Sequence, residues 1–160
     1  MIRDAIERDV GCIADGLVRV QNLHADAYPS IYRRFTVADA VSHLNASLAN
    51  PNLTIRVACE MTEVVGHYIL ATESTPESMF KHPQRFGHLY QIEVDPAYRG
   101  RGVGKRLLQD STLIAATMGL SRVVLDVWAF NAAARELFHS VGFSEFGSKL
   151  MLDIKSNQGG

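Results

Sequence analysis

The chain has 160 residues, of which 47% are hydrophobic and 21% are charged. This length is typical of one compact domain, and the composition is that of a globular protein rather than a disordered chain. Sixteen Lys and Arg residues are balanced by seventeen Asp and Glu residues, which leaves a formal net charge of −1. A nearly neutral chain has no global field to attract nucleic acid or an anionic membrane, so neither is expected as a partner.

No window of the sequence reaches the roughly 18 consecutive apolar residues of a membrane span, and the charged N-terminal residues do not resemble a signal peptide. A cytoplasmic protein is therefore expected. Cys12 and Cys59 lie far apart, without a CxxC pair or a histidine at metal-ligand spacing. The sequence predicts no disulfide framework and no metal site, and both thiols are expected to be free and buried.

Hydrophobic periodicity predicts the elements in the first half of the chain. Apolar residues recur every three to four positions from Asp9 until the break at Tyr28–Ser30, as an amphipathic helix requires. Thr36 is expected to cap a second helix, and Asn50–Asn52 marks a turn before two strands that form a hairpin. The expected elements are a strand at 1–5, a helix from 9, a helix at 37–49, and strands at 53–60 and 64–72.

The second half begins with the longest irregular stretch. Residues 73–85 are polar and contain two prolines, so they are expected to form a rim or lid. Asn131 and Gly142 are expected to begin and end the last helix. The expected elements are strands at 87–94, 123–127, 143–146 and 149–154 and helices at 104–118 and 132–140, in a single domain of residues 1–155 with a disordered tail at 156–160. This order describes a mixed α/β fold.

The most informative segment is the glycine-rich turn, Arg99-Gly100-Arg101-Gly102-Val103-Gly104-Lys105. Its place between a strand and a helix lets bare backbone amides and a helix N-terminus approach a phosphate, and a diphosphate is the expected ligand. Arg99 stands where a Walker A loop needs its first glycine, and Lys105 where a Rossmann fingerprint needs its third. A nucleoside triphosphatase loop and a dinucleotide site are therefore disfavoured. The alternative is an ordinary tight turn with a solvated basic face.

Two motifs resemble those of a known family. Arg99 to Gly104 fits the signature (Gln/Arg)-x-x-Gly-x-(Gly/Ala), and Val94-Asp95-Pro96-Ala97-Tyr98 precedes it as Val-x-Pro-x-Tyr does in that family. The segment from Asn131 to Ala134 and the later Gly142-Phe143 are similar to the second signature, an Asn-x-x-Ala helix that ends in Gly-Phe. On these motifs, which cover residues 87–146, the chain resembles the GNAT superfamily of acyl-coenzyme A dependent N-acyltransferases.

The resemblance implies a GNAT-like α/β fold, with a mixed, mostly antiparallel central sheet of about seven strands flanked by about four helices. Its fourth and fifth strands would splay apart to admit the pantetheine arm of acetyl-coenzyme A. The strand end would contact that arm, the glycine-rich turn would hold the pyrophosphate, and the last helix would contribute from the far side. The cofactor-binding residues implied are Ile92, Glu93, Val94, Arg99, Gly100, Arg101, Gly102, Val103, Gly104, Lys105, Asn131 and Phe138. No metal is implied.

Acyl transfer to an amine needs a neutral nucleophile, a stabilised oxyanion and a proton for the departing thiolate. The resemblance implies the backbone N–H of Val94 as the oxyanion donor. Many relatives place a Tyr on the last helix to protonate the sulfur, but the residue here is Phe138, which has no exchangeable proton. His139 is its neighbour and faces about 100° away on a helix, so the position of the acid is vacant.

The candidate base lies on the strand before the turn. By the period of two, the residues at even positions from His88 to Val94 share one face unless a bulge shifts them, and Glu93 faces the other way. Histidine titrates near neutral pH and can take a proton from an ammonium group through water, so His88 is the first candidate base and Tyr90 a candidate acid or water holder. Asp126 is the second candidate base. The alternative for His88 and Tyr90 is an ordinary strand residue, and the alternative for Asp126 is a capping role near the strand end.

The family's layout implies that His24, Asp26 and Tyr28 line the acceptor pocket, and the alternative is a solvated helix end. The leading function is an N-acetyltransferase that moves an acetyl group from acetyl-coenzyme A to a primary amine of a small molecule, peptide or protein, by direct transfer in a ternary complex. A non-catalytic acyl-coenzyme A binding domain is the alternative that Phe138 favours. A nucleic-acid binder is disfavoured by the charge balance, and a homodimer is left open beside a monomer.

Overall fold

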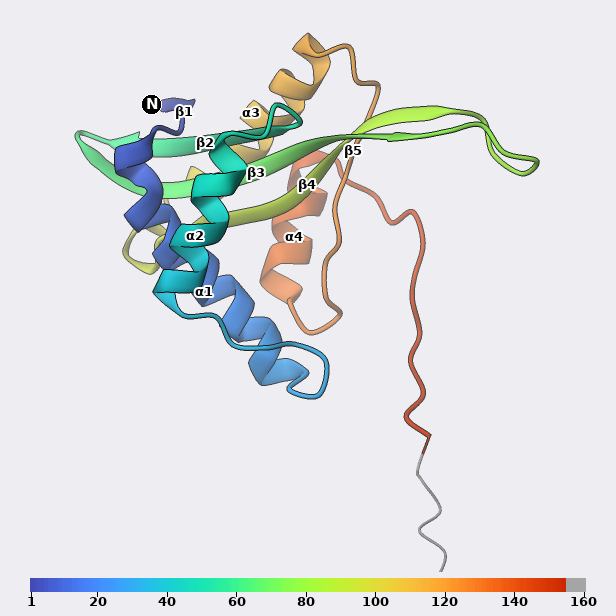
Figure 1. The fold of residues 1–160 in the computed structure, drawn as a ribbon, viewed down its shortest axis with the longest axis horizontal. Coiled ribbons are helices and arrows are strands. Elements are labelled where there is room, and N and C mark those ends of the chain that lie inside the picture. Colours follow the sequence, from blue (N-terminus) through green and yellow to red (C-terminus); the bar gives the residue numbers. More distant parts are fainter. Residues whose placement is uncertain (155–160) are drawn as a thin grey trace, which may run out of the picture.

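A computed structural model describes residues 1–154, with a five-stranded sheet in the order β1-β2-β3-β4-β5 (Figure 1). Helices α1 and α2 cover one face of the sheet, and α3 and α4 cover the other. In chain order the elements are β1 (Ile2–Asp4), α1 (Val10–Ala27), α2 (Val37–Leu48), β2 (Leu53–Glu60), β3 (Glu63–Thr75), β4 (Gln84–Val94), α3 (Val103–Thr117), β5 (Val123–Val124) and α4 (Ala132–Val141), with short 3-10 helices at Glu7–Asp9 and Pro96–Tyr98. The expected domain end at residue 155 and the tail at 156–160 lie outside the described residues.

The sheet opens between its fourth and fifth strands. Strands β1 to β4 pair antiparallel, and β5 joins the sheet parallel to β4. The ladder between β4 and β5 holds only two pairs, Gly87 with Val123 and His88 with Val124. Beyond His88, β4 continues to Val94, whereas the chain after Val124 leaves the ladder and runs to α4. The two strands therefore part where β4 leads into the glycine-rich turn, which is where the resemblance implies a splay.

The prediction of about seven strands is wrong, because residues 1–154 contain five. Residues 143–146 and 149–154 are not strands. They belong to an extended arm that leaves the body of the molecule, and every residue from 144 to 154 is exposed (Figure 1). A strand forms only where a neighbour supplies backbone hydrogen bonds, and no segment of the described chain pairs with this arm. The predicted strand 123–127 is shortened for the same reason.

The irregular stretch predicted at 73–85 is also shorter than expected. Strand β3 continues to Thr75 and β4 begins at Gln84, so only residues 76–83 connect them, at the tip of a hairpin that projects from the sheet (Figure 1). The polar residues at 73–75 and 84–85 indicate a loop but lie in strands, because this end of the hairpin extends beyond the helices and its side chains remain solvated. Glu73 becomes a strand residue as a result.

Two apolar layers hold the helices to the sheet, and neighbouring residues of β3 point into different layers, as the period of two requires. Thr36 caps α2 as predicted, since its hydroxyl accepts a hydrogen bond from the N–H of Asp39 at 3.2 Å. The layer under α1 and α2 contains Val10, Ile13, Ala14, Ala40, Leu44, Ile55, Val57, Cys59 and Ile69. The layer under α3 and α4 contains Ala58, Val65, Tyr68, Leu70, Leu89, Val103, Leu107, Leu108, Ala115, Leu120 and Phe138.

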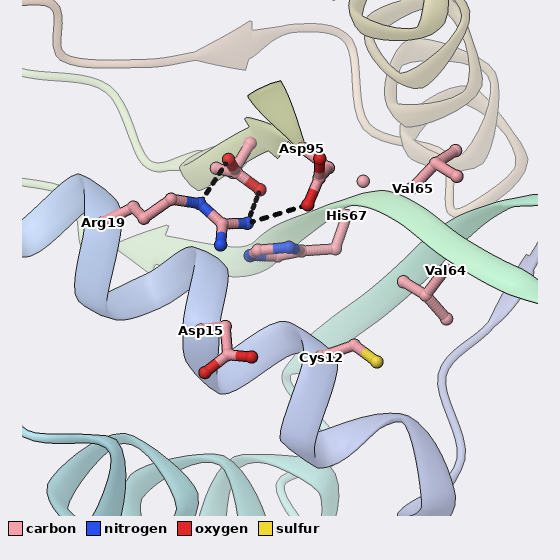
Figure 2. Close-up of a pocket in the computed structure, with 9 residues that line it drawn as sticks. Cys12, Asp15, Arg19, Val64, Val65, His67 and Asp95 are labelled. Carbon is pink, nitrogen blue, oxygen red and sulfur yellow. Dashed lines mark hydrogen bonds and ion pairs between the residues drawn. The ribbon is translucent and has the colours of Figure 1, made fainter. Parts of the chain in front are cut away.

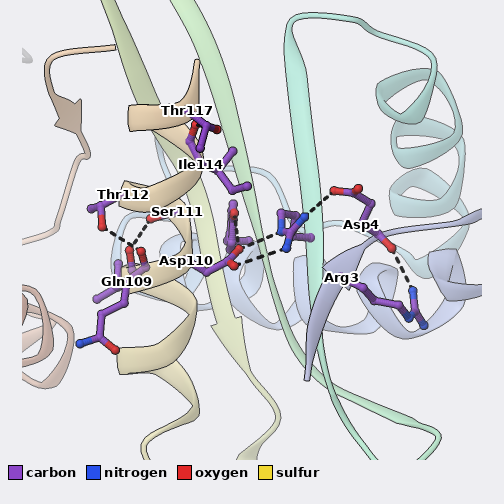
Figure 3. Close-up of polar contacts among 11 residues, drawn as sticks. Arg3, Asp4, Gln109, Asp110, Ser111, Thr112, Ile114 and Thr117 are labelled. Atoms are coloured by element: carbon purple, nitrogen blue, oxygen red, sulfur yellow. Dashed lines mark hydrogen bonds and ion pairs between the residues drawn. The ribbon is translucent and has the colours of Figure 1, made fainter. Parts of the chain in front are cut away.

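A polar cluster ties α3 to the sheet (Figure 3). Asp110 of α3 accepts hydrogen bonds from the Arg56 guanidinium at 2.8 and 3.3 Å and from the Tyr68 hydroxyl at 2.8 Å. Arg56 also donates to Asp4 of β1 at 2.8 Å. Burial and the Asp110 carboxylate raise the pKa of Tyr68 far above its usual value, so the phenol remains a donor. The cluster fixes the helix that follows the glycine-rich turn.

Both cysteines are free thiols, and Cys59 is buried whereas Cys12 is exposed. The expectation of a buried thiol is therefore wrong for Cys12. It precedes the buried Ile13 on α1, and adjacent helical positions face about 100° apart, which turns it outward. Within residues 1–154, no helix combines the length and apolarity that crossing a bilayer requires. The described residues also contain no group of three His, Cys, Asp or Glu side chains placed to hold a metal ion.

Candidate active site

The glycine-rich turn forms a cradle of backbone amides at the start of α3. Gly100 and Gly102 adopt left-handed backbone conformations, with φ of 74° and 75°. A Cβ at Gly100 would meet nothing within 4 Å, so the outer side of the turn is open. Gly102 is the N-cap of α3 and offers no side chain to the amides of the first turn. Free amides at the positive end of a helix dipole suit an anionic group such as a pyrophosphate.

The basic side chains of the turn divide into two groups. Arg99 turns back toward β4, where its Nε donates to the Val94 carbonyl at 3.0 Å and its Nη2 lies 3.5 Å from a Glu93 oxygen. Arg101 and Lys105 are both exposed, and the Arg101 guanidinium lies over the Tyr98 ring, 5.1 Å from its centroid. The structure therefore places Arg99 as a link between the turn and the strand, and leaves Arg101 and Lys105 exposed to solvent.

A β-bulge interrupts β4. Ile69 of β3 pairs with Gln91, but the next residue of β3, Leu70, pairs with Leu89. Tyr90 is therefore an extra residue without a partner across the ladder. One extra residue reverses the alternation of side chains along a strand. Odd-numbered residues before the bulge and even-numbered residues after it therefore point to the same face of the sheet.

The bulge separates the candidate catalytic residues from the strand end. Ile92 and Val94 pack with the layer under α3 and α4, and so does Leu89 on the other side of the bulge. His88 precedes Leu89 and therefore points to the face of α1 and α2, where Tyr90 also lies. The period-two expectation does not hold across Tyr90. The strand end is reached from the side of the glycine-rich turn, and His88 from the opposite side of the sheet.

His88, Tyr90 and Asp126 form one polar cluster with Glu73, a residue that the sequence pattern did not reveal. His88 Nδ1 lies 2.9 Å from Glu73 Oε1, and its Nε2 lies 3.2 Å from Asp126 Oδ2. The Tyr90 hydroxyl donates to the same Glu73 oxygen at 2.5 Å. A proton on either ring nitrogen of His88 thus has a carboxylate acceptor. The Asp126 side chain is 92% exposed, so this end of the cluster faces solvent.

The cluster holds a negative charge beside the imidazole. The hydrogen bond from Tyr90 lowers the pKa of Glu73, burial opposes the decrease, and His88 adds to it. The same hydrogen bond raises the pKa of Tyr90. At neutral pH, Glu73 is therefore an ionised acceptor and Tyr90 a protonated donor. An approaching ammonium group would be attracted to this side of the sheet.

An ion cluster around the buried Glu93 carboxylate lies behind the strand end (Figure 2). Arg19 of α1 donates to both carboxylate oxygens of Glu93 at 3.1 Å each, and its Nη2 lies 3.8 Å from Asp95. His67 is fully buried beside them, and its Nε2 has no hydrogen-bond partner within residues 1–154. Burial lowers the pKa of His67 to about 4, with a smaller contribution from the Arg19 charge. A Cβ at Gly16 would lie 2.6 Å from His67 Cε1, so only glycine lets α1 come this close.

An apolar pocket of about 370 Å³ opens between the sheet and helices α1 and α2. Gln91, directly after the bulge, is only 7% exposed, and its Nε2 has no hydrogen-bond partner in the described chain. A buried amide without a partner costs free energy, so Gln91 is the polar side chain of the pocket with an unused donor. The pocket is lined by Leu17, Val20, Gln21, His24, Phe35, His43, Ser47, Leu53, Ile69, Tyr90 and Gln91.

The three residues expected at an acceptor pocket lie in different surroundings. His24 lines the pocket, and burial lowers its pKa. The rings of His24 and Tyr28 lie 5.8 and 5.1 Å from the ring of Trp128, measured between centroids. Asp26 is outside the pocket lining and forms an exposed ion pair with Arg34. The structure thus brings His24 and Tyr28 together around an aromatic residue and leaves Asp26 apart.

The sequence profile of the Acetyltransferase (GNAT) family matches residues 17–143, a range that includes the glycine-rich turn and the bulged strand. This chain belongs to the GNAT family. The resemblance inferred from the two motifs is confirmed by this match over most of the chain.

Individual relatives within the GNAT family match shorter segments. Mycothiol acetyltransferase of Amycolatopsis mediterranei is 35% identical over 89 residues, which is 55% of this chain and 29% of the relative. N-alpha-acetyltransferase RimI of Mycobacterium tuberculosis is 48% identical over 59 residues, which is 37% of this chain and 35% of the relative. The chain thus spans well under half the length of both. A solved structure of a mutant BH1408 protein from Bacillus halodurans has the same fold, with a TM-score of 0.90 at 20% identity, over 96% of this chain and 99% of that one.

GNAT family members generally use acetyl-coenzyme A, and the chain offers features that fit it. The open glycine cradle suits its pyrophosphate, and the parting of β4 and β5 suits an extended arm. Asn131 serves as the N-cap of α4, where its Oδ1 accepts from the Ala134 N–H at 3.2 Å. Phe138 is 7% exposed and packs in the layer under α3 and α4, so it supplies apolar packing and no proton. Its neighbour His139 bonds the Phe143 carbonyl at 3.0 Å through Nδ1.

Three site residues lie outside the sequence prediction for different reasons. Glu73 falls in the predicted loop because its neighbours are polar, although the alternation that includes Ile69 and Ala71 places it on the face of His88. Gln91 was hidden by the bulge, which no residue type marks in advance. Trp128 is the chain's sole tryptophan, and that rarity was the signal that could have directed attention to it.

Proposed function

We propose that this GNAT family member transfers an acetyl group from acetyl-coenzyme A to a primary amine, by direct transfer in a ternary complex. The observation that carries the proposal is the bulge at Tyr90. Because of it, β4 can serve a donor site on one face of the sheet and an acceptor site on the other. The amide cradle opens on the side of α3, and the His88 cluster with the Gln91 pocket lies on the side of α1 and α2. Two substrates that enter from these opposite faces can meet where β4 and β5 part.

On the donor side, the backbone amides from Gly100 to Gly104 would bind the pyrophosphate, with Arg101 and Lys105 adding positive charge. The backbone of residues 92–94 would hold the pantetheine arm, and the Val94 N–H would stabilise the oxyanion. Acetyl-coenzyme A supplies an acyl group activated as a thioester. Arg99 supports this side indirectly, because it joins the turn to the Val94 carbonyl.

On the acceptor side, His88 would remove the proton of the amine, directly or through one water. Glu73 orients the imidazole through Nδ1, and the exposed Asp126 side chain would swing away from Nε2 so that this nitrogen can accept a proton. The amine nitrogen forms the new C–N bond as the C–S bond breaks, and its proton passes to Nε2 of His88. Because a thiol has a reference pKa of about 8.5, departure of the thiolate without a dedicated acid costs little at neutral pH. The Phe138 side chain is therefore compatible with turnover.

The pocket indicates the kind of amine that fits. Its wall is mostly apolar, and it is lined in part by Gln91, whose buried Nε2 has no hydrogen-bond partner in the described chain. A small amine with an apolar body would fill the volume, and a carbonyl or hydroxyl oxygen on it would pair Gln91 Nε2 once that side chain turned into the pocket. The anionic Glu73 at the pocket's edge would attract the amino group.

A non-catalytic acyl-coenzyme A binding domain is the second candidate, because Phe138 cannot protonate the leaving thiolate. The two candidates are separated by turnover. We expect release of free coenzyme A thiol from acetyl-coenzyme A with members of a panel of primary amines that ranges from polar aminoglycosides to arylalkylamines and peptide N-termini. Donor binding in calorimetry with no thiol release for any amine would instead identify the binding domain.

The donor site is tested by a matched pair of variants at Gly102. Asn and Asp both tolerate a left-handed backbone better than other side chains, and they differ mainly in charge. Gly102→Asp should weaken acetyl-coenzyme A binding by orders of magnitude, because its carboxylate faces the pyrophosphate, while Gly102→Asn should lose much less. Equal affinities of the two variants and the parent chain in calorimetry would refute the cradle as the pyrophosphate site.

A further inference from the structure

The arm at residues 143–154 carries an unusual set of apolar side chains for a segment in water. Scattered exposed apolar residues are normal, but a group of them in one segment marks a surface that is buried in an interface. Their exposed fractions are 95% for Phe146, 93% for Leu150, 60% for Met151, 82% for Leu152 and 83% for Ile154.

The order of these residues is that of a strand with one buried face. Leu150, Leu152 and Ile154 occupy alternate positions, with Met151 and Asp153 between them. Apolar residues at every second position are typical of a half-buried strand. The sequence predicts a strand here, and the described chain supplies no neighbour that would complete it.

The sheet has an unpaired edge at β5, and this edge is apolar like the arm. Strand β5 is the last in the order, and its ladder with β4 stops after two pairs. Leu125 and Val127 continue the apolar run past the ladder and are only partly buried. An edge strand with unpaired backbone groups is a template for another strand, and an uncovered apolar edge promotes association.

The arm does not turn back to this edge in its own chain. Phe143 anchors its start, since its N–H donates to the Phe138 carbonyl at 3.1 Å. Glu145 forms an ion pair with Arg135 on the flank of α4. Beyond Gly147 the chain continues outward instead of reversing, so the apolar residues lie away from the body of their own molecule (Figure 1).

We propose that two copies of this chain exchange their arms, and that residues 149–154 of each copy add a strand to the β5 edge of the other at residues 123–127. At roughly 100 Å² of apolar surface per large side chain, the three that share a face on each arm, Leu150, Leu152 and Ile154, and a matching area of each sheet edge bury about 1,200 Å², which is the scale of a specific interface. The exchange is reciprocal, so it closes into a two-fold dimer. It also places the partner's strand beside Asp126.

The oligomeric state gives the first test. Light scattering coupled to gel filtration should give the mass of a dimer for the parent chain and of a monomer for the double variant Leu150→Glu/Leu152→Glu. Met151→Glu is the matched control, because Met151 points to the other face of the strand, and it should remain a dimer. Circular dichroism should show all three folded, with only the strand signal of the exchanged arm lost in the double variant, since the arm lies outside both apolar layers. A monomeric parent chain, or a dimer that survives the double variant, would overturn the proposal.

Cross-linking separates exchange from an arm that folds onto its own sheet. In a Cys12→Ser background, one copy carries Arg122→Cys next to β5 and a differently tagged copy carries Lys149→Cys or Asp153→Cys. A bifunctional maleimide should join the two tags after co-expression. A chain that carries both substitutions should also link mainly between copies. If that chain instead links within itself and the mixed tags stay separate, the arm folds back on its own sheet and the proposal fails.

Discussion

At the scale of single residues, Tyr90 has the largest effect on the chemistry. As the extra residue of the bulge, it lets Ile92 and Val94 face the side of the glycine-rich turn while His88 faces α1 and α2. Without it, all four side chains would share one face and the imidazole would lie on the donor side. In the proposed mechanism the bulge gives each of two substrates its own face of one strand, and bulges next to active sites commonly redirect side chains in this way.

If His88 is the base, His88→Ala should lower kcat/KM for the acceptor by about a hundredfold, the usual contribution of a positioned acid or base. The variant should also lose the limb of the pH–rate profile that depends on this group. Asp126→Asn serves as a control that keeps the imidazole, and its loss should be smaller because Glu73 still holds the other nitrogen. Initial rates of thiol release across pH measure both. An unaltered limb in His88→Ala would move the role to Asp126 or to water.

A second residue-scale prediction concerns His67, whose pKa of about 4 in the folded state lies below the ordinary value of 6.5. Between these values the unfolded chain binds a proton that the folded chain does not, so stability falls as the pH is lowered through this window. The free energy of unfolding should drop by about 2 kcal/mol from pH 7 to pH 5 on account of this group.

Urea unfolding at the two pH values measures that drop, and His67→Gln is the control because glutamine does not titrate. The variant should lose less stability than the parent chain between pH 7 and pH 5, whatever its stability at pH 7. The same pH dependence in both chains would show that His67 does not take up the proton.

At the scale of elements, α3 is the part whose placement matters most, since its first turn is the proposed pyrophosphate site. Two clusters fix the surroundings of that turn. Asp110 joins α3 to β1, β2 and β3 through Arg56 and Tyr68, and Glu93 joins the end of β4 to α1 through Arg19 and to the turn through Arg99. Both clusters are built from residues far apart in sequence.

Removing Asp110 should therefore be costly. Asp110→Ala leaves the Arg56 guanidinium, 14% exposed, without its main partner and should lower the free energy of unfolding by about 3 kcal/mol. Tyr68→Phe keeps the ion pair and should cost about 1 kcal/mol. Denaturant unfolding gives both values. If Asp110→Ala costs no more than Tyr68→Phe, the ion pair does not hold α3.

At the scale of the whole molecule, the arm makes stability depend on assembly. Only folded copies exchange arms, so the Tm of the parent chain should rise with protein concentration, by about 2 °C for each tenfold increase. A chain that ends at residue 148 should show a Tm independent of concentration. Scanning calorimetry at several concentrations tests this, and a constant Tm for the parent chain would contradict an exchanged dimer.

The sequence alone determined the features that depend on neighbouring residues. The glycine-rich turn could be recognised because Arg99 to Lys105 are contiguous and a phosphate cradle is a local structure, and Thr36 could be recognised as a cap because its partner is three residues away. The helices and the order of the first strands followed from periodicity, and the family from the two motifs.

Only the tertiary structure decided which strand residues meet. The contact of Glu73 with His88 depends on the register of β3 against β4, the direction of His88 on one inserted residue, and the unpaired Gln91 on how α1 and α2 cover the sheet. The predicted strands at 143–146 and 149–154 also show that a local pattern cannot specify a contact with a distant segment. Their alternation is correct for a strand, but a strand is completed by hydrogen bonds to a neighbour, and that neighbour is not specified by the segment itself.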